Sequence, residues 1–395
     1  MAAVEYELAQ VVRRFRDAFE QKHQPLRRQL RVLDAIALCR TAALGGHADE
    51  CDSCGHIRIS YNSCRNRHCP KCQGSQREKW IEARQQKLLP VRYFHVVFTL
   101  PQEINIYCLR YPVALYNLLF ACSKSTIETF AADAKHLGAI PGMISVLHTW
   151  GQNLTLHPHV HMIVPAGGFT VSGHWKHTKQ KGKYLFPVKA MSIVYKNKFI
   201  EGLLALIAEH NMPPVSTTDR QMLYNKDWVV YAKQPFGGPQ QVIEYLGRYS
   251  HKIAIRNHRI TAIDDDTVSF RYKDYADGCK QKEMTLEATE FLRRFCLHIL
   301  PKGFRKIRHY GFLSNRCGQV FKQQQMQMGI TPLKQTSDWK TIAKEKLHFD
   351  VDQCPCCKKG KMKELLSFDN NGPPQWLLWK LQLQEKCGQT TARFF

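Results

Sequence analysis

Apolar side chains recur with a helical period at the start of the chain. A first stripe predicts a helix that buries one face, and it consists of Leu8, Val11, Val12, Phe15 and Phe19. A second stripe over residues 30–37 predicts another helix, which the glycine pair at 45–46 ends. The chain therefore begins with two amphipathic helices.

Strand and helix patterns alternate irregularly through the middle of the chain. The β-branched and aromatic runs that predict strands lie at 91–100, 142–152, 159–164, 228–232 and 252–273. Helical patterns lie at 77–89, 111–132, 193–211, 240–250 and 288–300, and the glycine pair at 167–168 predicts a turn. Beyond about 315 periodicity is weak until 376–383. This mixture favours an α+β fold with a largely antiparallel sheet.

Composition narrows the class of protein. The 395 residues, 44% of them hydrophobic and 23% charged, are typical of a globular protein with two or three domains. The formal charge of +24 indicates a polyanionic partner, for which nucleic acid is the usual candidate. No run is apolar enough to span a membrane, and no secretory signal precedes the 15 cysteines. We therefore expect a cytoplasmic protein whose clustered cysteines bind metal.

Two CxxC pairs form the strongest local motif. Cys51 and Cys54 are separated by fourteen residues from Cys69 and Cys72, a spacing that predicts one tetrahedral Zn²⁺ site with four thiolates. Nearby residues are alternative ligands or part of a second site: Cys39, His47, Cys64 and His68. A CPCC run at 354–357 resembles half of a further site.

Basic side chains surround these cysteines. Their density on a small zinc scaffold suits contact with DNA phosphates, and a solvated basic surface is the alternative interpretation. These basic residues are Arg58, Arg65, Arg67, Lys71 and Arg77.

Three histidines alternate at 157–161. An HxHxH run is expected only about 0.04 times by chance in a chain with this histidine content. Residues two apart on a strand share a face, so His159 and His161 project together and suit one divalent ion. Histidines that merely pack on a sheet surface are the alternative.

Two tyrosines lie four residues apart on a predicted helix. Tyr245 and Tyr249 share one helix face, which by itself also suits core packing. Basic groups around tyrosine hydroxyls fit a phosphodiester substrate. They are Arg248, which lies between the two tyrosines, and His251, Lys252, Arg256 and Arg259, which follow them.

Several motifs together resemble one family, the two-tyrosine HUH transposases of bacterial rolling-circle insertion sequences. The runs that carry this resemblance are HTWGQ at 148–152, HPHVH at 157–161, YAKQPFGGPQQ at 231–241, YLGRYSHKIAI at 245–255 and RKIRHYGFL at 305–313. The segment at 51–74 is similar to the amino-terminal zinc module of that family. The resemblance covers residues from about 10 to about 320, and the remaining residues match less clearly.

The resemblance implies a five-stranded antiparallel sheet and assigns roles to residues. His159 and His161 would bind Mg²⁺ or Mn²⁺ with a third ligand, for which His148 is the first candidate and Gln152 the second. Tyr245 and Tyr249 would be the nucleophiles, with Lys233 among the groups that stabilise phosphate charge. The implied organisation is an N-terminal helical region (1–46), a zinc module (47–85), an HUH catalytic domain (86–310) and a C-terminal region (311–395).

The function implied is DNA nicking and strand transfer through 5′-phosphotyrosine intermediates, which mobilises an insertion sequence. The expected partners are single-stranded DNA, hairpins at the transposon ends and target DNA, and the expected location is the bacterial cytoplasm in association with the nucleoid. A zinc-dependent DNA-binding protein without catalysis, such as a decayed transposase, is the main alternative. A metal-dependent hydrolase is a third, which the scarcity of Asp and Glu after His159 disfavours.

Overall fold

The chain forms two compact units, each built from separated stretches. The structure, a computed structural model, describes residues 5–85, 89–233, 241, 242, 247, 253–275, 277–329 and 338–386. The first unit comprises Met1–Lys79, Ile255–Ile299 and Thr336–Phe395, and the second comprises Trp80–Ala254 and Leu300–Gln335. These units differ from the four consecutive regions expected from the sequence, because distant stretches pack together in each. No helix among the described residues is long and apolar enough to cross a bilayer.

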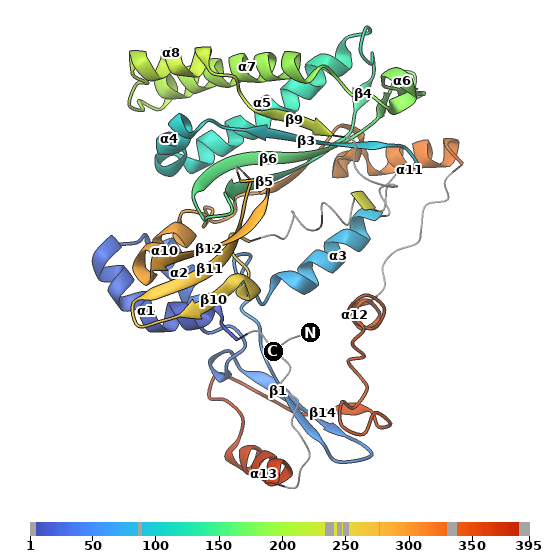
Figure 1. The fold of residues 1–395 in the computed structure, drawn as a ribbon. Helices are drawn as coiled ribbons and strands as arrows, with labels where there is room; N and C mark the ends of the chain where they lie inside the picture. The colour runs from blue at the N-terminus through green and yellow to red at the C-terminus, as the bar shows by residue number, and fades with distance from the viewer. Residues whose placement is uncertain are drawn as a thin grey trace. The chain divides into compact units, whose positions relative to one another are not determined.

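A five-stranded antiparallel sheet forms the centre of the second unit (Figure 1). Its strands run in the order β13-β5-β6-β3-β9. Their bounds are β3 (Tyr93–Thr99), β5 (Met143–Trp150), β6 (Leu156–Pro165), β9 (Val230–Lys233) and β13 (Ile307–Tyr310). The α+β class with an antiparallel sheet is therefore confirmed, and the strand number is the one that the resemblance implies.

Two long helices cover one face of this sheet. They are α5 (Pro112–Ala132), which begins with a proline at its first turn, and α7 (Val188–Glu209), and Figure 1 shows both on the same side of the strands. Side chains alternate between the faces of a strand, so every second residue points to these helices. Those that form the core beneath the helices include Val96, Phe98, Leu147, Val160 and Met162. The histidines of β6 occupy the alternate positions and therefore lie on the opposite face.

That opposite face has a smaller apolar core near one end. Ile144, Val146 and Ile163 are buried there with Phe312 and Phe321. Phe312 belongs to a 3-10 turn after β13, and Phe321 to α11 (Gly318–Gln327). This core reaches Val146, which lies opposite His161, so the histidine positions begin where the core ends.

Shorter elements complete the second unit. They are α4 (Asn105–Arg110), α6 (Lys179–Gly182), α8 (Thr217–Asn225) and a small sheet of β4 (Ile140–Pro141), β7 (Gly167–Phe169) and β8 (Trp175–His177). The turn predicted at 167–168 is instead strand β7. A Cβ on Gly167 would lie 2.5 Å from the ring of Trp175, so the glycine permits a close strand contact rather than a turn.

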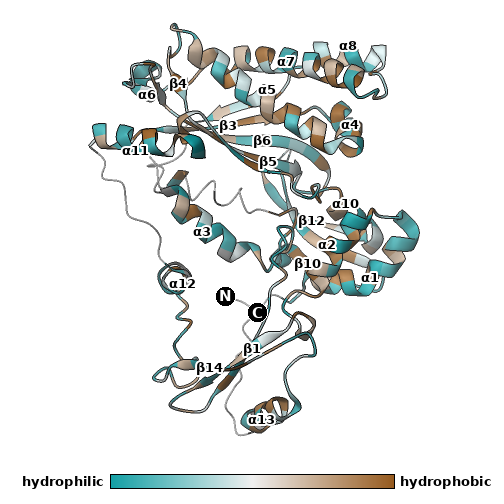
Figure 2. Ribbon diagram, turned by 180° about the vertical axis from the view of Figure 1, so that it is seen from behind, coloured by the Kyte–Doolittle hydropathy of each residue, from teal (hydrophilic) through white to brown (hydrophobic). Residues whose placement is uncertain are grey.

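Two N-terminal helices begin the first unit, as the stripes predicted. Helices α1 (Leu8–His23) and α2 (Arg27–Ala37) show both hydrophobic and hydrophilic residues in Figure 2, and the predicted stripe of α1 is buried. A three-stranded sheet and a helix accompany them: β10 (Ile260–Ile263), β11 (Thr267–Asp274), β12 (Lys280–Glu287) and α10 (Ala288–Cys296). Phe270, Phe291 and Phe295 are buried in this part.

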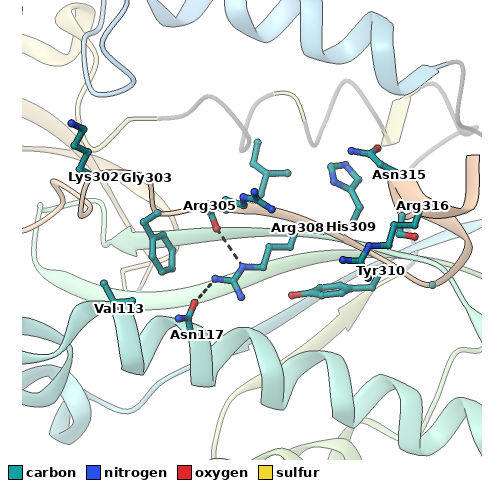
Figure 3. Close-up of a pocket in the computed structure, with 14 residues that line it drawn as sticks. Val113, Asn117, Lys302, Gly303, Arg305, Arg308, His309, Tyr310, Asn315 and Arg316 are labelled. Atoms are coloured by element: carbon teal, nitrogen blue, oxygen red, sulfur yellow. Dashed lines mark hydrogen bonds between the residues drawn. The ribbon is translucent and has the colours of Figure 1, made fainter. Parts of the chain in front are cut away.

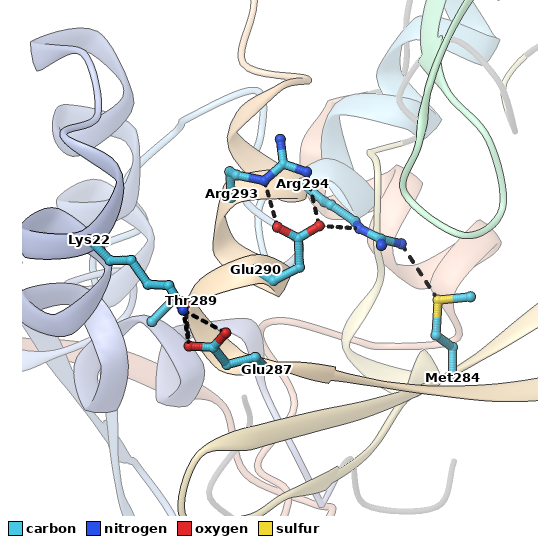
Figure 4. Close-up of polar contacts among 7 residues, drawn as sticks. All are labelled: Lys22, Met284, Glu287, Thr289, Glu290, Arg293 and Arg294. Atoms are coloured by element: carbon cyan, nitrogen blue, oxygen red, sulfur yellow. Dashed lines mark hydrogen bonds and ion pairs between the residues drawn. The ribbon is translucent and has the colours of Figure 1, made fainter.

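Polar contacts connect α1 to the junction of β12 and α10 (Figure 4). The Lys22 Nζ donates to both carboxylate oxygens of Glu287 at 2.6 and 2.7 Å, and the Thr289 hydroxyl donates to the same carboxylate at 2.9 Å. Glu290 accepts from Arg293 and Arg294, which lowers the pKa of its carboxyl to about 2. The Lys22–Glu287 contact thus links residues 255–299 to α1, and the contacts of Glu290 lie within α10.

A second sheet of the first unit joins the two ends of the chain. Strands β1 (Gly46–Cys51) and β2 (Ile57–Tyr61) form a hairpin, and β14 (Met362–Phe368) pairs antiparallel with β1. Helices α12 (Trp339–Leu347) and α13 (Gln375–Lys386) flank β14 in sequence, and α3 (Gln73–Gln85) follows the second CxxC pair. The sequence did not predict β14, because little periodicity marks residues beyond 315.

Candidate functional site

Three histidines meet in the second unit, on the face of the sheet opposite α5 and α7. His148 on β5 lies directly opposite His159 on β6, and His161 follows two residues later on the same face. A ligating nitrogen of each lies within 4.8 Å of those of the other two. His148 and His161 are only 2% and 7% exposed, whereas His159 is half-buried. The antiparallel register therefore places the third histidine beside the predicted pair.

Hydrogen bonds at Nδ1 orient two of these rings. His159 Nδ1 lies 2.6 Å from the carbonyl oxygen of His157, which only accepts, so Nδ1 carries the proton and Nε2 keeps a lone pair. His161 Nδ1 lies 2.8 Å from Nε2 of His95. The Nε2 atoms of His159 and His161 approach to 3.1 Å. Both rings thus direct Nε2 to one point.

This geometry fits a divalent cation. Two ligands about 2.1 Å from one ion and at right angles to each other lie about 3 Å apart. The His148 ring stacks on Trp150 with centroids 4.6 Å apart and lies 4.6 Å from the His161 ring, so its position is also fixed. Three imidazole nitrogens are a donor set for a divalent transition metal, and they leave coordination positions open for substrate.

His95 is a member of this site that sequence reasoning missed. It lies on β3 next to β6, and burial lowers its pKa to about 4, which keeps the imidazole neutral. A neutral His95 Nε2 can accept the proton of His161 Nδ1, which places the lone pair of His161 on Nε2, the atom that can bind a metal. A single histidine inside an apolar strand pattern has no motif that would have identified it.

The other residues that the sequence analysis named for this site lie outside the histidine cluster or outside the described residues. Gln152 lies in the turn after β5, and His157 is exposed and does not belong to the histidine cluster. Lys233, at the end of β9, is exposed and lies directly opposite His95 in register, so it shares the histidine face. The predicted nucleophiles Tyr245 and Tyr249 lie outside the described residues, as do Arg248 and Lys252.

The cysteines of the first unit form two clusters, and their membership corrects the predicted grouping. Cys51 and Cys54 lie with Cys354 and Cys357, whereas Cys69 and Cys72 lie with Cys39 and Cys64. Strand β14 brings the C-terminal cysteines beside β1, and Cys39 follows α2 near the second CxxC pair. The four cysteines predicted to share one ion are therefore divided between two sites.

Two of the predicted DNA-binding residues of this module have internal partners. The Arg58 guanidinium is 8% exposed and donates to Asp49 at 2.8 Å and to the carbonyl of Val351 at 3.1 Å, so it stabilises the module and is not available to DNA. Lys71 pairs with Glu7 at 2.7 Å. Arg65 and Arg256 are exposed and Arg67 is half-buried.

A basic pocket follows the edge strand β13 of the second unit (Figure 3). Its volume is about 1110 Å³, and it is lined by Lys302, Arg305, Arg308 and Arg316 without an acidic side chain. The Arg308 guanidinium packs 4.1 Å from the Phe120 ring centroid and donates to Asn117 of α5. The motif RKIRHYGFL supplies Arg305 and Arg308, two of these four cations, but sequence reasoning did not name them as a binding surface.

Comparisons with known proteins identify the family. Residues 142–320 match a family model described as a putative transposase, and residues 11–100 match one described as a transposase zinc-binding domain. The putative transposase y4qJ of Sinorhizobium fredii is 42% identical over 393 residues, which cover 93% of this chain and 97% of that protein. The transposase for insertion sequence element IS801 of Pseudomonas savastanoi pv. phaseolicola is 29% identical over 347 residues, which cover 83% of this chain and 82% of that protein. No solved structure matches this chain. The chain belongs to the transposase family of the IS91 and IS801 type, the rolling-circle transposases.

Proposed function

We propose that this transposase cuts and transfers single-stranded DNA through a covalent phosphotyrosine link at a metal site of the HUH type. The observation that carries the proposal is the convergence of His148, His159 and His161 on one face of an antiparallel sheet. The Nε2 atoms of His159 and His161 face each other at 3.1 Å, the separation expected of two ligands of one ion. Transposases break and rejoin DNA strands, so a phosphate-activating site is needed.

The three histidines would hold Mg²⁺ or Mn²⁺. When bound, the ion supplies Lewis-acid polarisation of the scissile phosphate. The protein fixes the ring orientations through the His157 carbonyl, His95 and Trp150. These contacts pre-organise the ligands before DNA arrives.

Tyr245 and Tyr249 are the proposed nucleophiles. The phenol oxygen of one tyrosine forms a bond to phosphorus, and the bond from phosphorus to the 3′ oxygen breaks. The phenol loses its proton and the leaving 3′ oxygen gains one, so the products are a 5′-phosphotyrosine and a free 3′-hydroxyl. The phosphodiester energy is kept in the covalent link, and two tyrosines allow two ends to be exchanged without nucleotide hydrolysis.

Exposed cations supply the contacts to the phosphate backbone in this proposal. Lys233 shares the histidine face, and the basic pocket beside β13 offers four more cationic side chains. The expected DNA partners are the single-stranded or hairpin ends of the insertion sequence and the target DNA. The alternative of a DNA-binding protein without catalysis explains the charge and the cysteines but gives no role to the histidine cluster.

A labelled single-stranded oligonucleotide that carries an element end tests this proposal. With Mg²⁺ or Mn²⁺ we expect an adduct that resists SDS and that mass spectrometry assigns to Tyr245 or Tyr249. A free 5′-phosphate without an adduct would identify a hydrolase instead. Binding without any cleavage would favour the non-catalytic alternative.

His95 is proposed to act as a positioning residue. His95→Ala should raise the metal concentration needed for half-maximal cleavage by about 10- to 100-fold, because it removes the acceptor for His161 Nδ1. Saturating Mn²⁺ should restore most of the rate, and His95→Gln should retain part of the affinity because an amide oxygen accepts the same proton. A rate loss that no metal concentration reverses would instead assign His95 a purely structural role.

A further inference from the structure

We propose that the chain binds a second zinc ion, held by Cys51 and Cys54 near the N-terminus and by Cys354 and Cys357 near the C-terminus. The transposase zinc-binding model covers residues 11–100 and contains all four members of the other cluster, Cys39, Cys64, Cys69 and Cys72. The site proposed here takes half of its ligands from residues beyond both matched regions. It would make the two ends of the chain into one discontinuous zinc ribbon.

The sulfur positions fit a tetrahedral zinc ion. Cys51 Sγ lies 3.7 Å from Cys357 Sγ, and Cys54 Sγ lies 3.7 Å from Cys354 Sγ. A tetrahedron with zinc–sulfur distances of about 2.3 Å has sulfur–sulfur edges of about 3.8 Å. All four sulfurs lie within 4.8 Å of one another.

The backbone around each CxxC pair supports thiolates. The Ser53 N–H donates to Cys51 Sγ at 3.4 Å, and the Gly360 N–H donates to Cys357 Sγ at 3.3 Å. Such N–H to sulfur contacts stabilise the negative charge of a bound thiolate. A Cβ at position 360 would lie 2.4 Å from Cys51 Sγ, so only glycine lets the C-terminal turn approach this sulfur.

Contacts outside the cysteines hold the same two segments together. The Asp52 N–H donates to the Lys361 carbonyl oxygen at 3.1 Å, and the Lys361 N–H donates to the Asp52 carboxylate at 2.8 Å. From α13, Leu377 is fully buried against Ala48 and Ile57, and Gln384 Nε2 donates to the Gly55 carbonyl. The cysteines are thus brought together by an interface and not by a chance approach.

The cluster has a matched neighbour that is excluded from it. Cys356 lies between two of the proposed ligands but is exposed and belongs to neither cluster. A Cys356→Ser variant therefore serves as a control that removes a cysteine from this turn without removing a proposed ligand.

A zinc ion with four thiolates carries a net charge of about −2, which Lys358 and Lys359 in the same turn offset.

Zinc content of the purified full-length chain tests the proposal. We expect two zinc ions per chain in the wild type and in Cys356→Ser, and one in the double variant Cys354→Ser/Cys357→Ser. Elemental analysis also separates zinc from iron, which four thiolates can bind as well. A wild type with one zinc, or a double variant that keeps two, would overturn the proposal.

Thiol alkylation of the wild type gives a measurement that does not depend on the folding of a variant. With zinc bound, Cys356 should react with iodoacetamide at least about tenfold faster than Cys354 and Cys357, because metal-bound thiolates are shielded. Chelation should remove the difference and release residues 350–386 to proteolysis. Equal alkylation rates of the three cysteines in the zinc-loaded protein would show that no metal is bound there.

Discussion

Replacing His159 or His161 with alanine should reduce the rate of single-stranded DNA cleavage by at least about a thousandfold. A metal ion that polarises the scissile phosphate is worth several kcal/mol in the transition state, and about 4 kcal/mol corresponds to this factor. Each variant removes one of the two Nε2 atoms that face each other at 3.1 Å. Gel assays of cleavage at saturating DNA, with and without Mn²⁺, measure the effect.

DNA affinity separates this loss from a folding defect. Phosphate contacts are spread over many cations, so we expect the dissociation constant of both variants to stay within about threefold of the wild type. His210→Ala is a matched control, because His210 is an exposed histidine at the end of α7 in the same unit. Cleavage at the wild-type rate in His161→Ala would contradict a metal role for the cluster.

The third ligand is tested in the same assay. The His148 ring lies in the cluster, so His148→Ala should lose much of the activity, whereas Gln152→Ala should lose little. Cleavage in EDTA should stop for the wild type and return with Mg²⁺ or Mn²⁺. Full activity of His148→Ala would move the assignment to Gln152.

The shared face of His159 and His161 could be predicted because its geometry is local. An HxH run on a strand fixes two side chains on one face, and the preceding strand is joined to it by a short turn. His148 was named as third ligand from the family resemblance, and the structure places it opposite His159 in antiparallel register. His95 was not predictable, because β3 is more than 60 residues away in sequence and which strand neighbours β6 is a matter of topology.

The predicted grouping of the four cysteines was wrong because the observed clusters join residues that are far apart in sequence. Spacing favours ligands that are close in sequence, so Cys51 and Cys54 were assigned to Cys69 and Cys72. The structure instead pairs the first two with cysteines about 300 residues later, through a strand that has no clear pattern of its own. In β14 the exposed positions are too frequent to give a hydrophobic alternation. Strand β12 was not predicted either, because its residues are at most half-buried.

The division into units depends on contacts that no local pattern encodes. Residues 255–299 follow the tyrosine motif and were therefore assigned to the catalytic domain. In the structure they lie in the first compact unit, where α10 packs with α1 and Lys22 donates a hydrogen bond to Glu287. Amphipathic stripes show that a helix has a partner but do not identify it.

The double variant Tyr245→Phe/Tyr249→Phe should form no covalent adduct with DNA. Phenylalanine removes only the nucleophilic oxygen and preserves the ring, so packing of either side chain should be kept. We expect the dissociation constant for single-stranded DNA to stay within about threefold of the wild type, because the cations remain. SDS gels of a labelled oligonucleotide measure the adduct, and filter binding measures the affinity.

The single variants separate the roles of the two oxygens. Both hydroxyls cannot occupy the in-line position at one phosphate at the same time, so each single variant should either lose one of two strand-transfer steps or cleave through the remaining tyrosine. Tyr224→Phe, an exposed tyrosine of α8, is the matched control and should form the adduct at the wild-type level. An undiminished adduct in the double variant would show that both tyrosines are structural. The histidine site would then have to act with a different nucleophile, since the metal ligands themselves cannot form the covalent link while they hold the ion.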